Sequence, residues 1–383
     1  KNHQGDHARD YFDRDTRTLT LPGHCIFGPK VTDADIASFK IVSHLNGSLI
    51  LQDNARITGL QGLSSLESIQ GDLVLKGTGL KQISGLNALR RVEGKIAISH
   101  NKNLLSLEGF SCLEHLGNDL SLASNPVLTT INGFSSLKRI EEGNLEILDN
   151  PSLQNISGFD KLEGVCGTLH LEQCPQLENV NFLAGLIHLV SLQINKVRLD
   201  DPSPLRKLFL ANSRFPGFIK ITSCFLQDLS FMKGLKFVDS SFYLNNNLLT
   251  NLNGLESLEG TGASFSLAGN RISDLGPLRQ LKRINGILSV ANNALISLTG
   301  LESLRILRTK KWNNSPSTLR IYGNPDLHDI SAIANVNAAD QIFFLHLDKS
   351  QAFSDKPPLE PFFMRNIVQI IDFRSGSVIP TYC

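Results

Sequence analysis

A unit of about two dozen residues repeats along most of the chain, and it constrains the fold more than any other feature. A short apolar–x–apolar segment recurs at steps of 23 to 25 residues, with two longer steps of 27 and 31. Repeats of this period are typical of solenoids, in which each coil buries its apolar edge against its neighbours. The first apolar residues of these segments are Leu49, Leu73, Ile96, Leu120, Leu145, Leu169, Leu192, Ile219, Phe242, Phe265, Leu288 and Leu319.

The pattern inside one repeat predicts the structure of one coil. Alternation places Leu120 and Leu122 inward and Ser121 outward, as in a short strand. Strands of neighbouring coils then pair into a parallel sheet at a spacing of about 4.8 Å. The connecting sides are short and rich in glycine, and parallel crossovers are right-handed in nearly all proteins. We therefore predict a mainly β, right-handed, β-helix-like solenoid with a parallel sheet and little α-helix.

The fifth position after the start of most predicted strands holds asparagine, and Thr78, Cys174 and Cys224 replace it in other coils. A buried amide there can satisfy backbone N–H and C=O groups of adjacent turns. Cys174 and Cys224 take the place of asparagine in two coils, so we interpret them as structural rather than catalytic. Two coils separate them by about 9–10 Å, which is too far for a disulfide. The asparagines of this column are Asn54, Asn101, Asn125, Asn150, Asn247, Asn270, Asn293 and Asn324.

The repeat resembles a known family over about Cys25 to Asn324, and two stretches carry the resemblance. They are residues 25–51, CIFGPKVTDADIASFKIVSHLNGSLIL, and residues 107–159, LEGFSCLEHLGNDLSLASNPVLTTINGFSSLKRIEEGNLEILDNPSLQNISGF. Both resemble the receptor L domain, a leucine-rich-repeat relative that supplies the ligand-binding lobes of insulin- and EGF-receptor-type ectodomains and that also occurs in surface proteins of fungi, protists and bacteria. The resemblance implies a leucine-rich-repeat solenoid and an extracellular recognition or scaffold role. The chain departs from the family because it carries more coils and no cysteine-rich module between two lobes.

The repeat also predicts the organisation of the chain. The repeats occupy residues 49–342, and a solenoid needs its open ends covered. We expect an N-terminal polar arm at 1–24, an N-terminal cap at 25–48 and a C-terminal cap at 343–383.

Composition and motifs exclude several classes of function. Lys plus Arg is 37 and Asp plus Glu is 36, and this balance argues against a nucleic-acid-binding protein. No apolar run approaches the roughly 20 residues that span a bilayer, so we expect no membrane insertion within this chain. The sequence lacks a nucleophile elbow, a phosphate-binding loop and metal-ligand spacings. We predict no catalytic residue, no cofactor and no metal, and hence no enzyme.

Two functional hypotheses remain. The first is an extracellular or cell-surface recognition or adhesion protein that binds a protein or glycan through a solenoid face. The alternative is an architectural subunit of a cell wall, an extracellular matrix or a surface filament, with possible self-assembly. Small outward residues such as Ala97 and Ser121 would suit close side-by-side packing.

The candidate contact residues point outward from the strands of the middle coils, where long polar and aromatic side chains replace small ones. A second candidate is Trp312, the single tryptophan, in the long insertion before Leu319. Sequons predict glycosylation at Asn46, Asn155 and Asn313. The predicted partner-binding residues on the strands are Glu146, His170, Glu172, Gln193, Asn195, Lys220, Tyr243 and Asn245.

Overall fold

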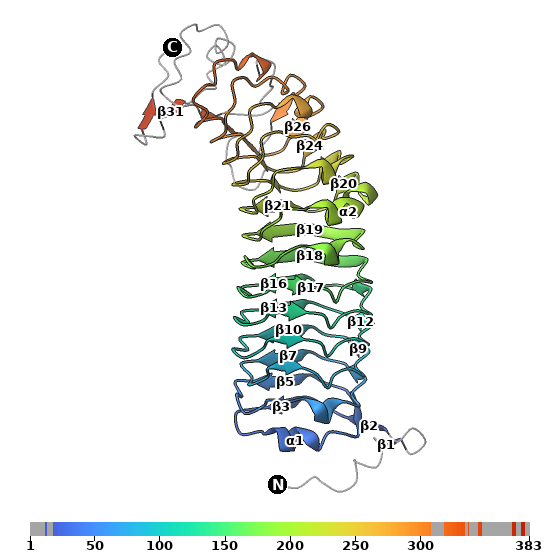
Figure 1. Cartoon of the computed structure of the whole chain (residues 1–383). Helices are drawn as coiled ribbons and strands as arrows, with labels where there is room; N and C mark the ends of the chain where they lie inside the picture. The colour runs from blue at the N-terminus through green and yellow to red at the C-terminus, as the bar shows by residue number, and fades with distance from the viewer. Residues whose placement is uncertain are drawn as a thin grey trace. The chain divides into compact units, whose positions relative to one another are not determined.

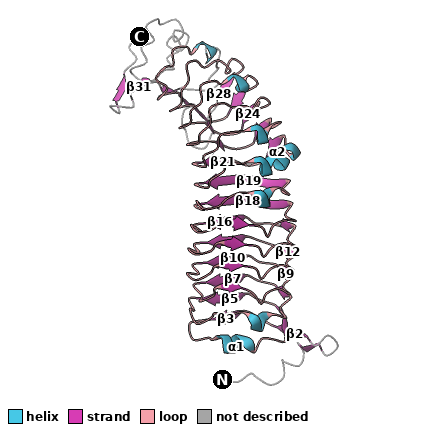
Figure 2. Ribbon diagram, in the orientation of Figure 1, coloured by secondary structure: helices cyan, strands magenta, loops and turns pink. Residues whose placement is uncertain are grey.

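The computed structural model describes residues 12–13, 18–307, 318–333, 336, 344–346, 370–372 and 377–379. The chain divides into two compact units, the first comprising residues 1–189 and 196–198 and the second 190–195 and 199–383. Both consist mainly of short strands paired in parallel, and helices are few and short (Figures 1 and 2). The predicted mainly β solenoid with a parallel sheet and little α-helix is confirmed.

In the first unit, one strand from each coil stacks on the strand of the next coil. Leu49 pairs with Leu73, and Leu120 pairs with Leu145, which is the register that the repeat predicts. Cys25 pairs with Leu49 in the same register, within the range expected to be the N-terminal cap. These strands are β3 (Cys25–Phe27), β5 (Leu49–Gln52), β7 (Leu73–Lys76), β10 (Ile96–Ser99), β13 (Leu120–Ala123), β16 (Leu145–Leu148) and β18 (Gly164–Glu172).

Two further columns of shorter strands complete the coils of the first unit. One column pairs with the beginning of β18, and the other forms a separate four-stranded sheet. The first contains β2 (Thr18–Leu21), β4 (Val42–Leu45), β6 (Ser68–Ile69), β9 (Arg91–Val92), β12 (His115–Leu116) and β15 (Arg139–Ile140), with β1 (Phe12–Asp13) antiparallel to β2. The second contains β8 (Gln82–Ile83), β11 (Ser106–Leu107), β14 (Thr130–Ile131) and β17 (Asn155–Ile156).

The second unit repeats the same plan, and Ile219 pairs with Phe242 in the predicted register. Its main column contains residues 190–195 of β19 (His188–Asn195), then β21 (Ile219–Thr222), β23 (Phe242–Tyr243), β25 (Phe265–Ser266), β27 (Ile287–Ser289), β29 (Thr318–Arg320) and β30 (Phe344–His346). Its second column contains β20 (Arg214–Phe215), β22 (Phe237–Val238), β24 (Gly260–Thr261), β26 (Arg283–Ile284) and β28 (Ile306–Leu307). A hairpin of β31 (Ile370–Asp372) and β32 (Ser377–Ile379) follows.

Helical segments are confined to corners and to one insertion. The insertion that lengthens the repeat before Ile219 forms a short helix, α2, preceded by a 3-10 turn. The helices are α1 (Asp33–Ala37) and α2 (Arg206–Ala211), and the 3-10 turns are η1 (Gln61–Leu63), η2 (Asn181–Leu183), η3 (Ser203–Leu205), η4 (Ser230–Met232), η5 (Gly276–Leu278) and η6 (Ser331–Ile333).

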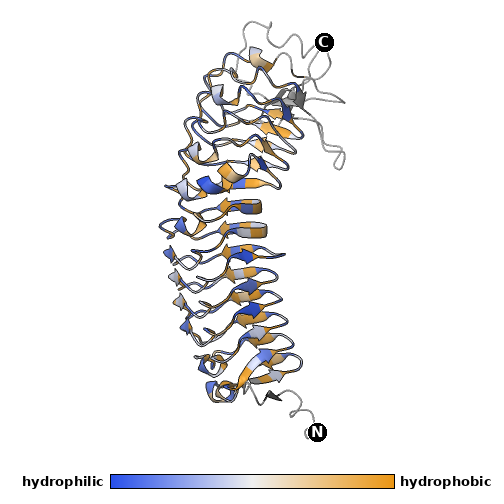
Figure 3. Cartoon of the chain, turned by 90° about the vertical axis from the view of Figure 1, so that its right-hand side faces the viewer, coloured by the Kyte–Doolittle hydropathy of each residue, from blue (hydrophilic) through white to orange (hydrophobic). Residues whose placement is uncertain are grey.

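The core of each unit is a set of stacked apolar columns (Figure 3). In the first unit the rings of Phe110, Phe134 and Phe159 are fully buried and stack with centroids 5.0 and 5.1 Å apart. Phe242 and Phe265 stack at 5.1 Å in the second unit. These distances match the spacing between neighbouring strands, so each phenylalanine stacks on the equivalent phenylalanine of the next coil.

Glycine marks one corner of the coil for two different reasons. At Gly254 the backbone φ is +110°, a value that L side chains rarely adopt. At Gly62 an added Cβ would lie 2.0 Å from the carbonyl oxygen of Ile36. Glycine therefore allows neighbouring coils to approach closely at this corner.

The predicted asparagine column is a buried hydrogen-bonded ladder. In the first unit, Asn125 is fully buried and its Nδ2 donates to the carbonyl of Ile98 at 3.0 Å. Its Oδ1 accepts from the backbone N–H of Asn101 at 3.1 Å, and its own N–H donates to Oδ1 of Asn150 at 3.0 Å. In the second unit, Asn247 bonds the carbonyl of Ile221 in the same way. The amides therefore satisfy the corner backbone groups that the strands leave unpaired.

The residue before each ladder position adopts a left-handed backbone conformation, which the sequence analysis did not foresee. In most coils its N–H donates to a carbonyl of the next coil, as Asp149 does to Glu172 at 3.0 Å. This conformation costs an L residue other than glycine about 1–2 kcal/mol. The residues, with φ between 50° and 75°, are Asp53, Gly77, His100, Ser124, Asp149, Gln173, Lys196, Ser223, Asn246, Gly269, Asn292 and Gly323.

Replacing a ladder amide should cost much more stability than replacing its neighbour. Asn125→Ala leaves buried backbone groups unpaired and should lower the free energy of unfolding by about 1–3 kcal/mol. Ser124→Ala, on the half-buried residue beside it, should change it by less than about 0.5 kcal/mol. Chemical denaturation of both variants measures the difference, and equal losses would contradict the assigned register.

Glycine should be preferred in the left-handed column. Gln173→Gly removes the steric cost of φ +55°, against a backbone entropy loss of about 0.5–1 kcal/mol, so it should leave stability unchanged or raise it by up to about 1 kcal/mol. Glu172→Gly, one residue earlier in β18, should lower stability. The same denaturation experiment compares the two, and a larger loss for Gln173→Gly would contradict the left-handed assignment.

Candidate functional site

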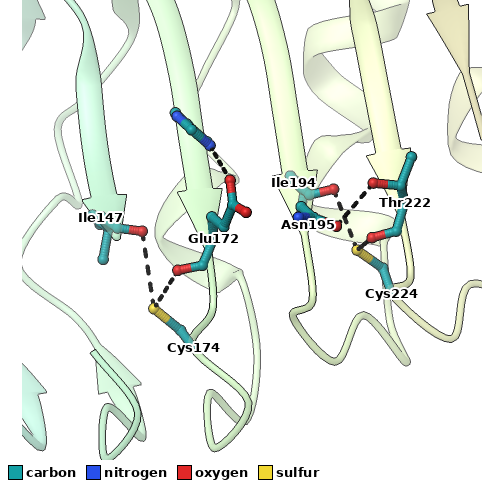
Figure 4. Close-up of polar contacts among 8 residues, drawn as sticks. Ile147, Glu172, Cys174, Ile194, Asn195, Thr222 and Cys224 are labelled. Atoms are coloured by element: carbon teal, nitrogen blue, oxygen red, sulfur yellow. Dashed lines mark hydrogen bonds and ion pairs between the residues drawn. The ribbon is translucent and has the colours of Figure 1, made fainter. Parts of the chain in front are cut away.

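Three of the predicted contact residues lie on the outer sheet face of the first unit. Glu146 on β16 is the register partner of His170 on β18, and both are half-buried. His170 Nε2 lies 2.7 Å from Oε2 of Glu172, two positions further along the same face (Figure 4). The imidazole and the carboxylate thus orient each other, and together with Glu146 they form a polar cluster on two adjacent strands.

The other five strand residues lie in the second unit. Gln193, Lys220 and Tyr243 are register partners on β19, β21 and β23, and all three are half-buried. Because strand spacing is about 4.8 Å, they form one outward row that combines an amide, an ammonium group and a phenol. This Gln193–Lys220–Tyr243 row offers both hydrogen-bonding and aromatic contact.

Two of the predicted contact residues have structural partners. Asn195 Oδ1 accepts from the Thr222 hydroxyl at 3.0 Å (Figure 4). Asn245 Oδ1 accepts from the backbone N–H of Ala268 at 3.1 Å. These bonds fix neighbouring strands, and they explain why asparagine occupies the two positions without a partner molecule. The predicted contact set therefore separates into a cluster in one unit and a row in the other, and Trp312 lies outside the described residues.

Two of the three sequons stand at exposed positions. Asn46 follows β4, and Asn155 begins β17, and both side chains are exposed. Asn313 lies outside the described residues. The positions of Asn46 and Asn155 permit an attached glycan on the folded protein.

The two ladder cysteines perform the structural task of asparagine (Figure 4). Cys174 Sγ lies 3.5 Å from the carbonyl of Glu172, and Cys224 Sγ lies 3.1 Å from that of Thr222. Burial raises the pKa of the Cys174 thiol to about 11, against a smaller lowering by a backbone hydrogen bond from Asn150. Five of the six cysteines fall in the described part of the chain, and all five are free thiols.

The described residues contain no group of three or more His, Cys, Asp or Glu side chains that could hold a metal ion. Among the described helices, none is long and apolar enough to cross a membrane.

A groove in the first unit was missed by the sequence analysis. A cavity of about 510 Å³ lies beside the left-handed column, where its residues face prolines that follow the ladder positions. The repeated Asn-Pro or Cys-Pro pairs at 125–126, 150–151 and 174–175 were the available signal. They could not be interpreted because the left-handed turn that opens the groove is a property of the stacked coils.

These features define the class of protein, a leucine-rich-repeat-like parallel solenoid. Residues 262–346 match the family Receptor L domain. The matched residues lie in the second unit and include Asn270, Asn293 and Asn324 of the ladder. The resemblance to receptor L-domain repeats is thus confirmed. No curated protein matches the chain.

Three solved structures are similar to the chain at low identity. InlF, an internalin from Listeria monocytogenes, is 17% identical with a TM-score of 0.35, over 85% of this chain and 88% of that one. The functional domain of InlJ from the same organism is 13% identical with a TM-score of 0.37, over 92% and 72%. The plant peptide hormone receptor RGFR1, solved in complex with RGF2, is 16% identical with a TM-score of 0.22, over 92% and 79%. At these identities no residue role is transferred.

The raised pKa of Cys174 predicts selective thiol labelling. A thiol with a pKa of about 11 stays protonated near pH 8, and thiolate is the reactive form. Iodoacetamide should therefore modify the half-buried Cys166 in the folded protein and leave the fully buried Cys174 unmodified. Peptide mass spectrometry measures both, and denatured protein is the control in which both react. Equal labelling in the folded state would contradict the ladder role.

Proposed function

We propose that this protein is a non-enzymatic recognition protein of the extracellular space or cell surface, and that it binds a protein or glycan partner through the outer face of its parallel sheet. The observation that carries the proposal is the Gln193–Lys220–Tyr243 row, in which three long side chains of different chemistry stand in register on adjacent strands. Tyrosine and mixed hydrogen-bonding groups are enriched where proteins recognise one another.

Two further observations support this proposal. The Receptor L domain match lies in the second unit, which also carries the row. The row is held on a rigid base, because Ile219 and Phe242 next to Lys220 and Tyr243 are fully buried. A surface that is fixed before binding loses little conformational entropy when a partner docks.

The row can be tested by a double substitution. Tyr243→Ala combined with Lys220→Glu removes the aromatic contact and reverses the charge, while both side chains point away from the core. Binding of partners captured from surface extracts of the native source should weaken at least about tenfold, or roughly 1.4 kcal/mol. Biolayer interferometry of the captured partner on both proteins gives the affinities.

The matched control is Phe225→Ala combined with Arg271→Glu. Phe225 and Arg271 are both exposed in the second unit but lie outside the strands, so the control makes the same chemical changes away from the sheet face. It should bind as the unsubstituted protein does. If the Phe225→Ala/Arg271→Glu variant loses binding and the Tyr243→Ala/Lys220→Glu variant retains it, the partner contacts the corner of the coil and not the sheet face.

Extracellular exposure predicts a glycan on at least one of Asn46, Asn155 and Asn313. Protein from its native source is treated with a peptide-N-glycosidase in water labelled with oxygen-18. Peptide mapping then detects each asparagine that carried a glycan as a labelled aspartate. The expected result is occupancy at the exposed Asn46 or Asn155, or at Asn313. Three unmodified asparagines would count against the extracellular assignment.

A further inference from the structure

The groove in the first unit is built from equivalent positions of successive coils. One wall carries four polar side chains from the left-handed column, each from a different coil. All belong to the first unit, and three are exposed while Ser124 is half-buried. These residues are Ser124, Asp149, Gln173 and Lys196. The wall thus presents a hydroxyl, a carboxylate, an amide and an ammonium group in that order.

The lining also contains an apolar set that is periodic. Pro126, Pro151 and Pro175 follow the ladder residues of three consecutive coils, and all three are exposed. The stacked rings of Phe110, Phe134 and Phe159 give a coil spacing of 5.0 to 5.1 Å in this unit. The lining therefore repeats one proline ring and one polar group in each of three successive coils, and Lys196 adds a polar group from a fourth.

The polar side chains of the groove are available to a ligand. Backbone N–H groups of Ser124 and Asp149 are already used, since they donate to carbonyls of the next coil at 2.9 and 3.0 Å. Within the described part of the chain, the side chains of Ser124, Asp149 and Gln173 make no hydrogen bond. Their hydrogen-bond donors and acceptors are therefore available to a ligand in the cavity.

The residue types in this wall are costly for the backbone. Glycine occupies the same left-handed column at Gly77, Gly269 and Gly323, where the conformation is free of strain. The groove instead carries glutamine at φ +55° and lysine at φ +52°, two residue types with no special aptitude for this conformation. Glutamine and lysine therefore cost backbone free energy at these two positions, which points to a role for their side chains other than the stability of the coil.

We propose that this groove binds a neutral, linear, β-linked pyranose oligosaccharide that lies along the stacking direction of the coils. When its linkages are β-1,4, such a chain is extended and advances by roughly one coil spacing per sugar ring, so successive rings can each meet one proline and one polar side chain. Pyranose rings have apolar C–H faces and hydroxyl edges, which match the apolar and polar sets of the lining. A concave site with apolar lining and a few placed polar groups is the usual form of a small-ligand site.

The charges of the groove favour a neutral ligand. Asp149 and Lys196 contribute one negative and one positive charge, so the lining has no net charge. A polyanionic glycan would gain from Lys196 and lose against Asp149. The groove shares no residue with the Gln193–Lys220–Tyr243 row, so different variants test the two proposals.

The experiment is calorimetric titration of the whole chain with three neutral probes, cellohexaose, laminarihexaose and chitohexaose. At least one should bind with a Kd of about 1 mM or tighter. Asp149→Ala combined with Gln173→Ala should weaken that binding at least about tenfold, and Pro151→Ala should weaken it by removing one apolar face. The matched control, Asp53→Ala, changes an exposed aspartate of the same column outside the groove and should bind normally.

Several outcomes would overturn the proposal. One is that none of the three hexasaccharides binds at millimolar concentration; another is that the Asp149/Gln173 double variant, with an unchanged melting temperature, binds as tightly as Asp53→Ala. A pool of random octapeptides that binds, and loses binding in the same double variant, would assign the groove to peptides. The Tyr243→Ala/Lys220→Glu variant should bind the hexasaccharide normally. If the oligosaccharide proposal fails, the proposed function of the sheet face is therefore unaffected. If the proposed function fails, the oligosaccharide proposal is likewise unaffected.

Discussion

A buried amide at the corner after most strands of the main column is the interaction on which the coils depend. Asn101 and Asn125 are linked directly, because Oδ1 of Asn125 accepts from both the backbone N–H and Nδ2 of Asn101, at 3.1 and 3.2 Å. Each amide spans two coils, and leaving such a buried group unpaired costs about 1–3 kcal/mol. A coil shifted by one residue would remove the amide from the ladder and break these bonds, as His100 or Lys102 in place of Asn101 would do. The ladder therefore fixes the register as strictly as the leucines fix the core.

A fixed register turns the sequence into columns on the surface. In the second unit it sets Lys220 beside Tyr243, and in the first unit it sets His170 beside Glu146. The same register brings residues of the left-handed column and the proline column together in the lining of the groove. Neighbouring positions on these surfaces come from residues about 24 apart in sequence, so a recognition surface can change residue by residue while the coil beneath it stays the same.

The repeat was sufficient to predict the strands, the pairing of Leu120 with Leu145, and the burial of Asn125, because apolar alternation and an in-register amide are local patterns. It did not predict the groove, since the left-handed turn at Gln173 arises only when one coil bonds the next. Asn195 was predicted as a contact residue because its hydrogen bond to Thr222 comes from the next coil, 27 residues away. Single-strand patterns show which side chains point outward, and the partners across strands decide which of these are free to bind.

The most direct measurement of the ladder is a double-mutant cycle on Asn101 and Asn125. The free energies of unfolding of the unsubstituted chain, Asn101→Ala, Asn125→Ala and the double variant give the coupling between the two amides. Because the amides bond each other, the account predicts a coupling of at least about 0.5 kcal/mol, while Asn101→Ala combined with Asn270→Ala, which share no hydrogen-bond partner, should be additive. Additive losses for Asn101 and Asn125, within about 0.3 kcal/mol, would contradict a continuous amide ladder.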